Sequence, residues 1–167
     1  MADLKYVTYC GLYCRLCSTV GRIPQQASAL RESLEKGGWE QFGEFVVPGF
    51  KEFWAALETL SELGETCPGC RGGCGAPDCG IRRCAQDRGV EVCSACADFP
   101  CERIEQFGRA YPHLIADARY QQEVGLETWV QEQELRCCTG FCHDDIRRPS
   151  VPLWGAPEAD GGEPRGG

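Results

Sequence analysis

The stretch "CPGCRGGCGAPDCGIRRCAQDRGVEVCSACADFPC", residues 67–101, decides the fold. Cysteine and glycine dominate it, and its few apolar residues follow no clear helical or strand period. Such a segment cannot bury enough apolar surface to offset the conformational entropy that it loses on folding. We therefore expect cross-links through its cysteines to hold it together.

Metal ions are favoured over disulfides as these cross-links. The chain has 14 cysteines in 167 residues, a density that in a short secreted protein indicates a disulfide scaffold. The N-terminus, however, shows no apolar core or cleavage site of a signal peptide, and no apolar run is long enough to span a bilayer. We expect a cytoplasmic protein with no membrane partner, in a compartment where thiols stay reduced and clustered cysteines are typically metal ligands.

Helical patterns precede the cysteine-rich stretch. Residues 23–36 are rich in helix formers, with Pro24 in the first turn and two glycines at 37–38 to end the helix. Residues 39–63 carry large apolar residues at helical spacing, and the Pro-Gly pair at 48–49 is expected to break them into two helices.

Two further helices are expected after the stretch, over residues 102–111 and 126–136. We expect both to pack on the aromatic helices upstream. Large apolar residues at helical spacing are usually core, and the sequence predicts a core that contains Phe42, Phe45, Phe53, Trp54, Phe107 and Trp129.

These patterns predict a mainly α fold, a small helical domain with an irregular, metal-stapled cysteine-rich loop subdomain. We expect one domain over residues 1–148, in which the metal-binding subdomain 66–101 packs on the helices of 23–63 and 102–136. The Pro- and Gly-rich tail 149–167 is expected to be disordered.

The charge of the chain argues against nucleic acid as a partner. The formal net charge is −8, and each zinc ion bound by four thiolates would leave a further net charge of about −2. A nucleic-acid surface needs a basic patch, and we expect none.

The spacing of the cysteines indicates metal sites, but does not by itself identify the metal. C-x-x-C pairs, whose tight turn aims two thiolates at one metal ion, occur at Cys14/Cys17, Cys67/Cys70 and Cys93/Cys96. Twenty-two residues separate Cys70 from Cys93, close to the spacing of two pairs that face each other across one zinc ion.

An iron–sulfur cluster for electron transfer or redox sensing is the alternative. Cys10, Cys14 and Cys17 have the C-x-x-x-C-x-x-C spacing of radical enzymes that bind such a cluster with S-adenosylmethionine. Those enzymes have alternating strands and helices, a pattern that this sequence lacks. Zinc is favoured because the compact cysteine run of bacterial ferredoxins is also absent.

The motifs "YCGLYCRLC", "CPGC", "CGIRRCAQDRGVEVCSACADFPCERIEQF", "GLETWVQEQ" and "GFCHDDIR" resemble the family catalogued as domain of unknown function 3795. Its members are small bacterial and archaeal cysteine-rich proteins presumed to bind zinc. The resemblance runs from about Tyr9 to Arg147 and implies metal ligands drawn from Cys10, Cys14, Cys17, Cys67, Cys70, Cys79, Cys84, Cys93, Cys96 and Cys101.

Four other cysteines are additions to the family's pattern and form either an extra site or free thiols: Cys74, Cys137, Cys138 and Cys142. His143 is either a ligand beside them or a surface residue, and His113 is expected to be a loop or cap residue.

Catalysis has no support in the sequence. Only His113 and His143 are available to activate a cysteine nucleophile, and no glycine-rich phosphate loop follows a strand. The expected function is metal binding with a mainly structural role, in a module that presents a surface to a protein partner. A catalytic metalloprotein is the weaker alternative, because it would need an open coordination position.

Overall fold

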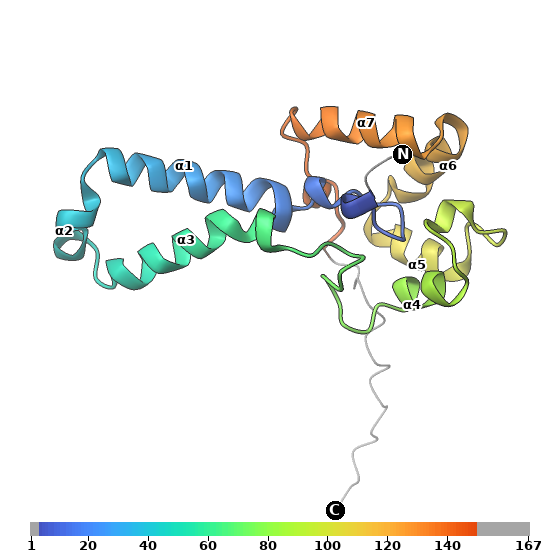
Figure 1. Ribbon diagram of the computed structural model, residues 1–167, viewed down its shortest axis with the longest axis horizontal. Coiled ribbons are helices and arrows are strands. Elements are labelled where there is room, and N and C mark those ends of the chain that lie inside the picture. Colours follow the sequence, from blue (N-terminus) through green and yellow to red (C-terminus); the bar gives the residue numbers. More distant parts are fainter. Residues whose placement is uncertain (1–3, 150–167) are drawn as a thin grey trace, which may run out of the picture.

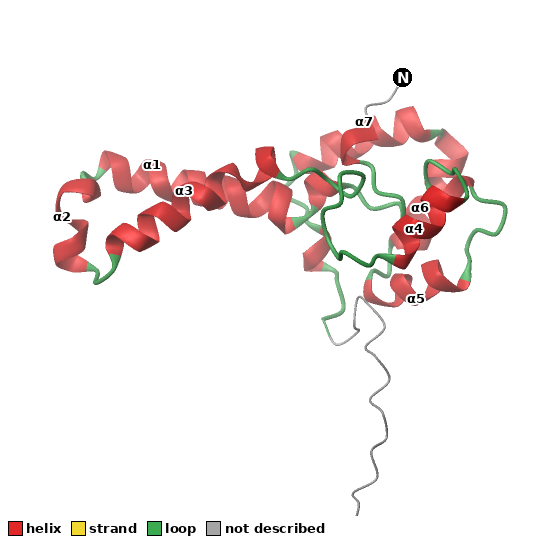
Figure 2. Cartoon of the chain, turned by 60° about the horizontal axis from the view of Figure 1, so that its bottom comes forward, coloured by secondary structure: helices red, strands yellow, loops and turns green. Residues whose placement is uncertain are grey.

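The structure is a computed structural model, and it describes residues 4–149. Within that range the chain forms seven α-helices and no β-strand, apart from an isolated bridge between Val7 and Tyr13 (Figures 1 and 2). The fold is therefore mainly α, as predicted. The helices are α1 (Ile23–Lys36), α2 (Trp39–Val46), α3 (Phe50–Thr66), α4 (Gly80–Asp87), α5 (Glu102–Ala110), α6 (Leu114–Val124) and α7 (Leu126–Cys137).

Helices α1, α2 and α3 form an arm that projects from the rest of the molecule, with α2 at its far end (Figure 1). The bounds predicted for α1 are confirmed, and the predicted break at Pro48 and Gly49 separates α2 from α3. Gly49 has φ = 76°, a conformation that favours glycine. A Cβ at Gly43 would lie 2.5 Å from Cδ1 of Phe50, so the close corner between α2 and α3 also requires a glycine.

The predicted core is wrong for three aromatic residues of the arm. Phe42 is 40% exposed, Phe45 91% and Phe53 41%, because the tip of the arm has only the other two arm helices to pack against. The side chains that the arm buries include Phe50 and Leu57 of α3 and Ala27 of α1, where the two helices pack together. Apolar residues at helical spacing predict which face of a helix is apolar, but they do not predict whether another element covers that face.

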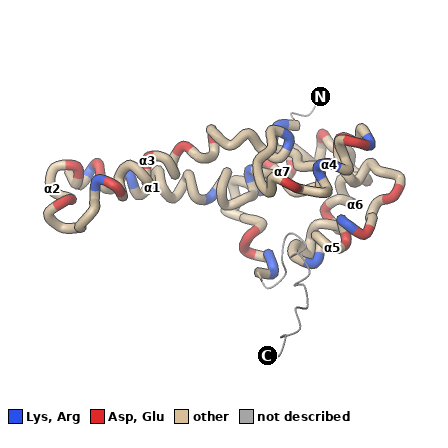
Figure 3. The backbone as a smooth tube through the Cα atoms, turned by 90° about the horizontal axis from the view of Figure 1, so that it is seen from below, with Lys and Arg blue, Asp and Glu red and all other residues tan. Residues whose placement is uncertain are grey.

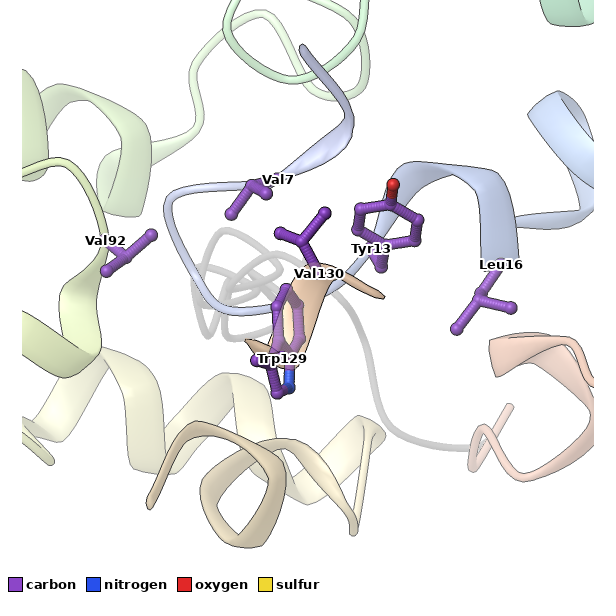
Figure 4. Close-up of a cluster of buried hydrophobic side chains, with 6 residues drawn as sticks. All are labelled: Val7, Tyr13, Leu16, Val92, Trp129 and Val130. Atoms are coloured by element: carbon purple, nitrogen blue, oxygen red, sulfur yellow. The ribbon is translucent and has the colours of Figure 1, made fainter. Parts of the chain in front are cut away.

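The main core lies in the body, away from the arm. Val7, Tyr13 and Leu16 of the N-terminal segment pack with Trp129 and Val130 of α7, and Val92 completes the cluster (Figure 4). Trp129 is 1% exposed, which confirms its predicted place in the core.

Helices α5 and α7 do not pack on the arm, contrary to the expectation. Helix α7 lies against α6 and the short 3-10 helix η2 (Cys14–Leu16), and α5 lies against α4 and α6. Phe107 and Trp54, both predicted as core, are half-buried. The N-terminal segment, and not the aromatic helices of the arm, is thus the element that packs against α7.

Basic and acidic side chains are interspersed along both the arm and the body (Figure 3). Across residues 4–149 we find no helix that combines the length and the apolar character needed to span a bilayer. The predicted disordered tail lies outside the described residues from Ser150 onward.

Candidate metal centres

Four cysteines line one cavity of about 310 Å³, which we name the four-thiol cavity. They come from α4, from the 3-10 turn η4 (Cys93–Ala95) and from the residue before α5. The turn is closed by a hydrogen bond from the Cys96 amide to the Cys93 carbonyl, 3.0 Å, which is the tight turn expected of a C-x-x-C pair. The four residues are Cys84, Cys93, Cys96 and Cys101.

Arg88 lies at the rim of the four-thiol cavity. Its Nη1 is 3.5 Å from Sγ of Cys96, and the same guanidinium forms an ion pair with Asp98.

Seven cysteines line a second cavity, of about 270 Å³, which we name the seven-thiol cavity. Three come from the N-terminal segment, three from the loop after α3, and one from the residue before α4. They are Cys10, Cys14, Cys17, Cys67, Cys70, Cys74 and Cys79.

Two hydrogen bonds involve the thiols of this cavity. The Cys67 thiol donates to Sγ of Cys74 at 3.1 Å, although seven positions separate the two residues. Sγ of Cys79 accepts a hydrogen bond from the Arg82 amide, 3.5 Å, at the start of α4.

The buried guanidinium of Arg82 holds the loop that carries these cysteines. Its Nη1 donates to the carbonyls of Cys74 at 2.9 Å and Cys70 at 3.4 Å, and its Nη2 to those of Ala76 at 2.8 Å and Pro77 at 3.1 Å. Arg82 is 8% exposed and lines the seven-thiol cavity. Among the described residues it has no carboxylate within salt-bridge distance, so its partners are neutral.

Burial raises the pKa of four of these thiols, three in the seven-thiol cavity and one in the four-thiol cavity. The pKa of Cys10, Cys14 and Cys93 is raised to about 12, and that of Cys74 to about 11, mainly through loss of solvent. Neighbouring cysteines raise it further, because one thiolate disfavours the next. Without a cation these thiols are protonated at neutral pH, so a metal ion would displace protons as it binds.

A family profile described as Protein of unknown function (DUF3795) matches residues 6–106 of the chain. The chain belongs to this family. No curated protein and no solved structure matches it. All eleven cysteines of the two cavities lie within the part that the DUF3795 profile covers, whereas the seven-thiol cavity is also lined by His143 and Asp144, which lie beyond it.

The structure divides the DUF3795 cysteines differently from the sequence-based pairing. Cys67 and Cys70 line the seven-thiol cavity, whereas Cys93 and Cys96 line the four-thiol cavity, so these two pairs do not face each other across one site. Cys74, which sequence reasoning set aside as an addition, lines the seven-thiol cavity. The signal that could have placed it is its position four residues after Cys70 in the same glycine-rich loop.

The three C-terminal cysteines line neither cavity. Cys138 is exposed, Cys142 is buried, and the Cys137 thiol donates to the Gln133 carbonyl at 3.2 Å. They are free cysteines in this structure.

His143 is buried, at 4% exposure, and is not the surface residue that one interpretation expected. Its Nε2 accepts the Tyr13 amide at 3.3 Å, so its proton lies on Nδ1 and is donated to Nε2 of His113, 3.0 Å away. Burial lowers the pKa of His143 to about 4 and keeps the ring neutral. His113 directly precedes α6 as its N-cap residue, in keeping with the expected cap position.

The cavities gather thiols without forming a closed coordination sphere. Between residues 4 and 149, no group of three or more His, Cys, Asp or Glu side chains is arranged to hold a metal ion. The donor chemistry nevertheless fits thiolate-binding metals, because cysteine thiols outnumber the carboxylate and imidazole groups that line each cavity. Side-chain rearrangement toward a bound ion would be required in each cavity.

Proposed function

We propose that this protein binds metal ions through cysteine thiolates and that the bound ions hold its cysteine-rich segment folded. The observation that carries the proposal is that eleven cysteines from separate segments line only two cavities. The predicted metal-binding subdomain 66–101 contributes eight of them, and the N-terminal triplet contributes the other three.

Zinc is the ion that the donor set favours in the four-thiol cavity. Four thiolates satisfy a tetrahedral zinc ion completely, and such closed sites are structural and not catalytic. The complex carries a net charge of about −2, which the guanidinium of Arg88 beside Cys96 would offset in part. In this cavity the ion would join α4, η4 and the start of α5.

The structural role follows from how little else stabilises the segment. Between residues 67 and 101 the only α-helix is α4, and its eight residues are too few for a helix that is stable alone. The apolar side chains that this segment buries are few, and two of them are the cysteines Cys67 and Cys93. Metal binding and folding of the segment would therefore be one equilibrium.

Elemental analysis and an absorption spectrum of anaerobically purified protein test the proposal. Zinc without a visible absorption band is the expected result. Brown protein that contains iron and acid-labile sulfide would show that the bound metal is an iron–sulfur cluster and not zinc. A chain that purifies without metal and binds none of either kind on reconstitution would refute the proposal.

A further inference from the structure

The seven-thiol cavity holds more sulfur than one metal ion can use. A tetrahedral ion takes four thiolates, so a single ion would leave three thiols of this cavity unligated. Those three would lie beside a centre that already carries a charge of about −2. The number of thiols is instead the number that two tetrahedral ions need when one thiolate bridges them.

We propose that the seven-thiol cavity is a binuclear centre, in which two metal ions share one thiolate, beside a mononuclear centre in the four-thiol cavity. This inference rests on the proposed function and adds to it the number of ions and their connection. Each ion then has four sulfur ligands, and all eleven thiols of the two cavities are used.

The position of Cys74 supports the larger ligand set. At a zinc–sulfur distance of about 2.3 Å, two thiolates on one tetrahedral ion lie about 3.8 Å apart. The two sulfurs of Cys67 and Cys74 are 3.1 Å apart, so a small rotation brings both onto one ion. Without Cys74 the cavity would hold six thiols, the set for two bridges instead of one.

The charge around the cavity supports a strongly anionic centre. Two zinc ions with seven thiolates carry a net charge of about −3, more than a single zinc ion with four. The guanidinium of Arg82 lines this cavity and is buried, and its partners among residues 4–149 are neutral carbonyls. A buried cation without a counter-ion is costly, and the centre would supply that counter-ion. His143, which also lines the cavity, is neutral, and the carboxylate of Asp144 accepts a hydrogen bond from the Ser18 amide at 3.3 Å.

Cadmium-113 NMR of the full chain tests the inference, because two cadmium ions that share a thiolate split each other's resonances. The chain is purified with a phosphine reductant and loaded with cadmium-113, and native mass spectrometry counts the bound ions. We expect three ions per chain, with two mutually split resonances and one unsplit resonance, all shifted as for cadmium bound to four thiolates.

Three variants assign the resonances. Cys74→Ser is expected to shift both split resonances and leave the unsplit one, and Cys84→Ser is expected to abolish only the unsplit one. Cys138→Ser is the matched control, because Cys138 is exposed and lines neither cavity, and it should change none of the three.

Failure of the inference is distinguishable from failure of the proposed function. Two unsplit resonances and two bound ions would leave the proposed function standing and overturn the binuclear centre, as would three unsplit resonances. A chain that binds no cadmium would overturn both. The spectrum of the unmodified chain decides between these outcomes, including the case in which Cys74→Ser does not fold.

Discussion

Replacement of Arg82 by glutamine should weaken metal binding by about two orders of magnitude. The guanidinium donates hydrogen bonds to the carbonyls of residues 70, 74, 76 and 77, and so holds the path of the loop between Cys70 and Cys79. A glutamine side chain is shorter, carries no charge and cannot span both pairs of carbonyls.

The magnitude follows from the hydrogen bonds that the substitution removes. Two of the four are short, at 2.8 Å to Ala76 and 2.9 Å to Cys74, and each bond from a charged donor contributes about 1.5–3 kcal/mol. We count only these two bonds, each at the low end of that range. The bond to the Cys70 carbonyl is long, at 3.4 Å, and water can replace the bond to the carbonyl of the exposed Pro77. The loss of about 3 kcal/mol corresponds to a weakening of roughly a hundredfold in the apparent dissociation constant.

Competition for zinc between the protein and a chromophoric chelator measures this constant. Arg82→Lys keeps the charge but not the fork of donors, so it should recover part of the loss. Arg83→Gln is the matched control, since Arg83 is a neighbouring exposed residue whose ion pair with Asp78 spans 3.8 Å. Zinc affinity of Arg82→Gln within twofold of the unmodified chain would show that Arg82 does not organise the site.

Three further outcomes are expected. Removal of metal with a chelator should abolish amide protection over residues 67–101 while α1 and α3 stay protected in hydrogen exchange, and uniform protection without metal would contradict the proposed role of the ions. Trp129→Ala should destabilise the protein by about 3–5 kcal/mol in thermal or denaturant unfolding, whereas Leu135→Ala on the same helix, 70% exposed, should have little effect. His143, with a folded pKa of about 4 against about 6.5 when unfolded, contributes stability that is complete above pH 6.5 and is lost as the pH falls toward 4. The unfolding free energy should therefore drop by about 2 kcal/mol more between pH 7 and pH 5 in the unmodified chain than in His143→Gln, and an equal drop in both would exclude this contribution.

The helices of the arm could be predicted from local signals, whereas their burial could not. Glycines at 37–38 and the Pro-Gly pair at 48–49 end helices whatever surrounds them, and α1 and the break before α3 lie where those residues indicate. The exposure of Phe45 depends on what lies beyond the tip of α2, and no local pattern contains that information.

Helices α4 and α6 were missed for different reasons. Helix α4 starts at Gly80, and the residues on its inner side are Arg82, Cys84 and Ala85. A buried cation and a thiol thus stand where a predicted helix would show a stripe of large apolar residues. Helix α6 buries Ala118 and Gln121 beside Leu114, residues too small or too polar to produce a recognisable apolar period.

Which cysteines share a cavity depends on contacts between segments that are distant in the sequence. The C-x-x-C spacing identifies each pair, but the Cys93 amide donates to the Tyr9 carbonyl at 2.7 Å, and this bond places the N-terminal segment beside η4. Arg71 fixes the same segment from the other side, through hydrogen bonds to the carbonyls of Leu4 and Val7. The N-terminal triplet therefore lines the same cavity as Cys67 and Cys70. The pair of Cys93 and Cys96 lines the other cavity, together with Cys84 and Cys101. Arg71→Ala removes these hydrogen bonds and loosens the segment. It should therefore shift the cadmium-113 resonances of the seven-thiol cavity more than the resonance of the four-thiol cavity.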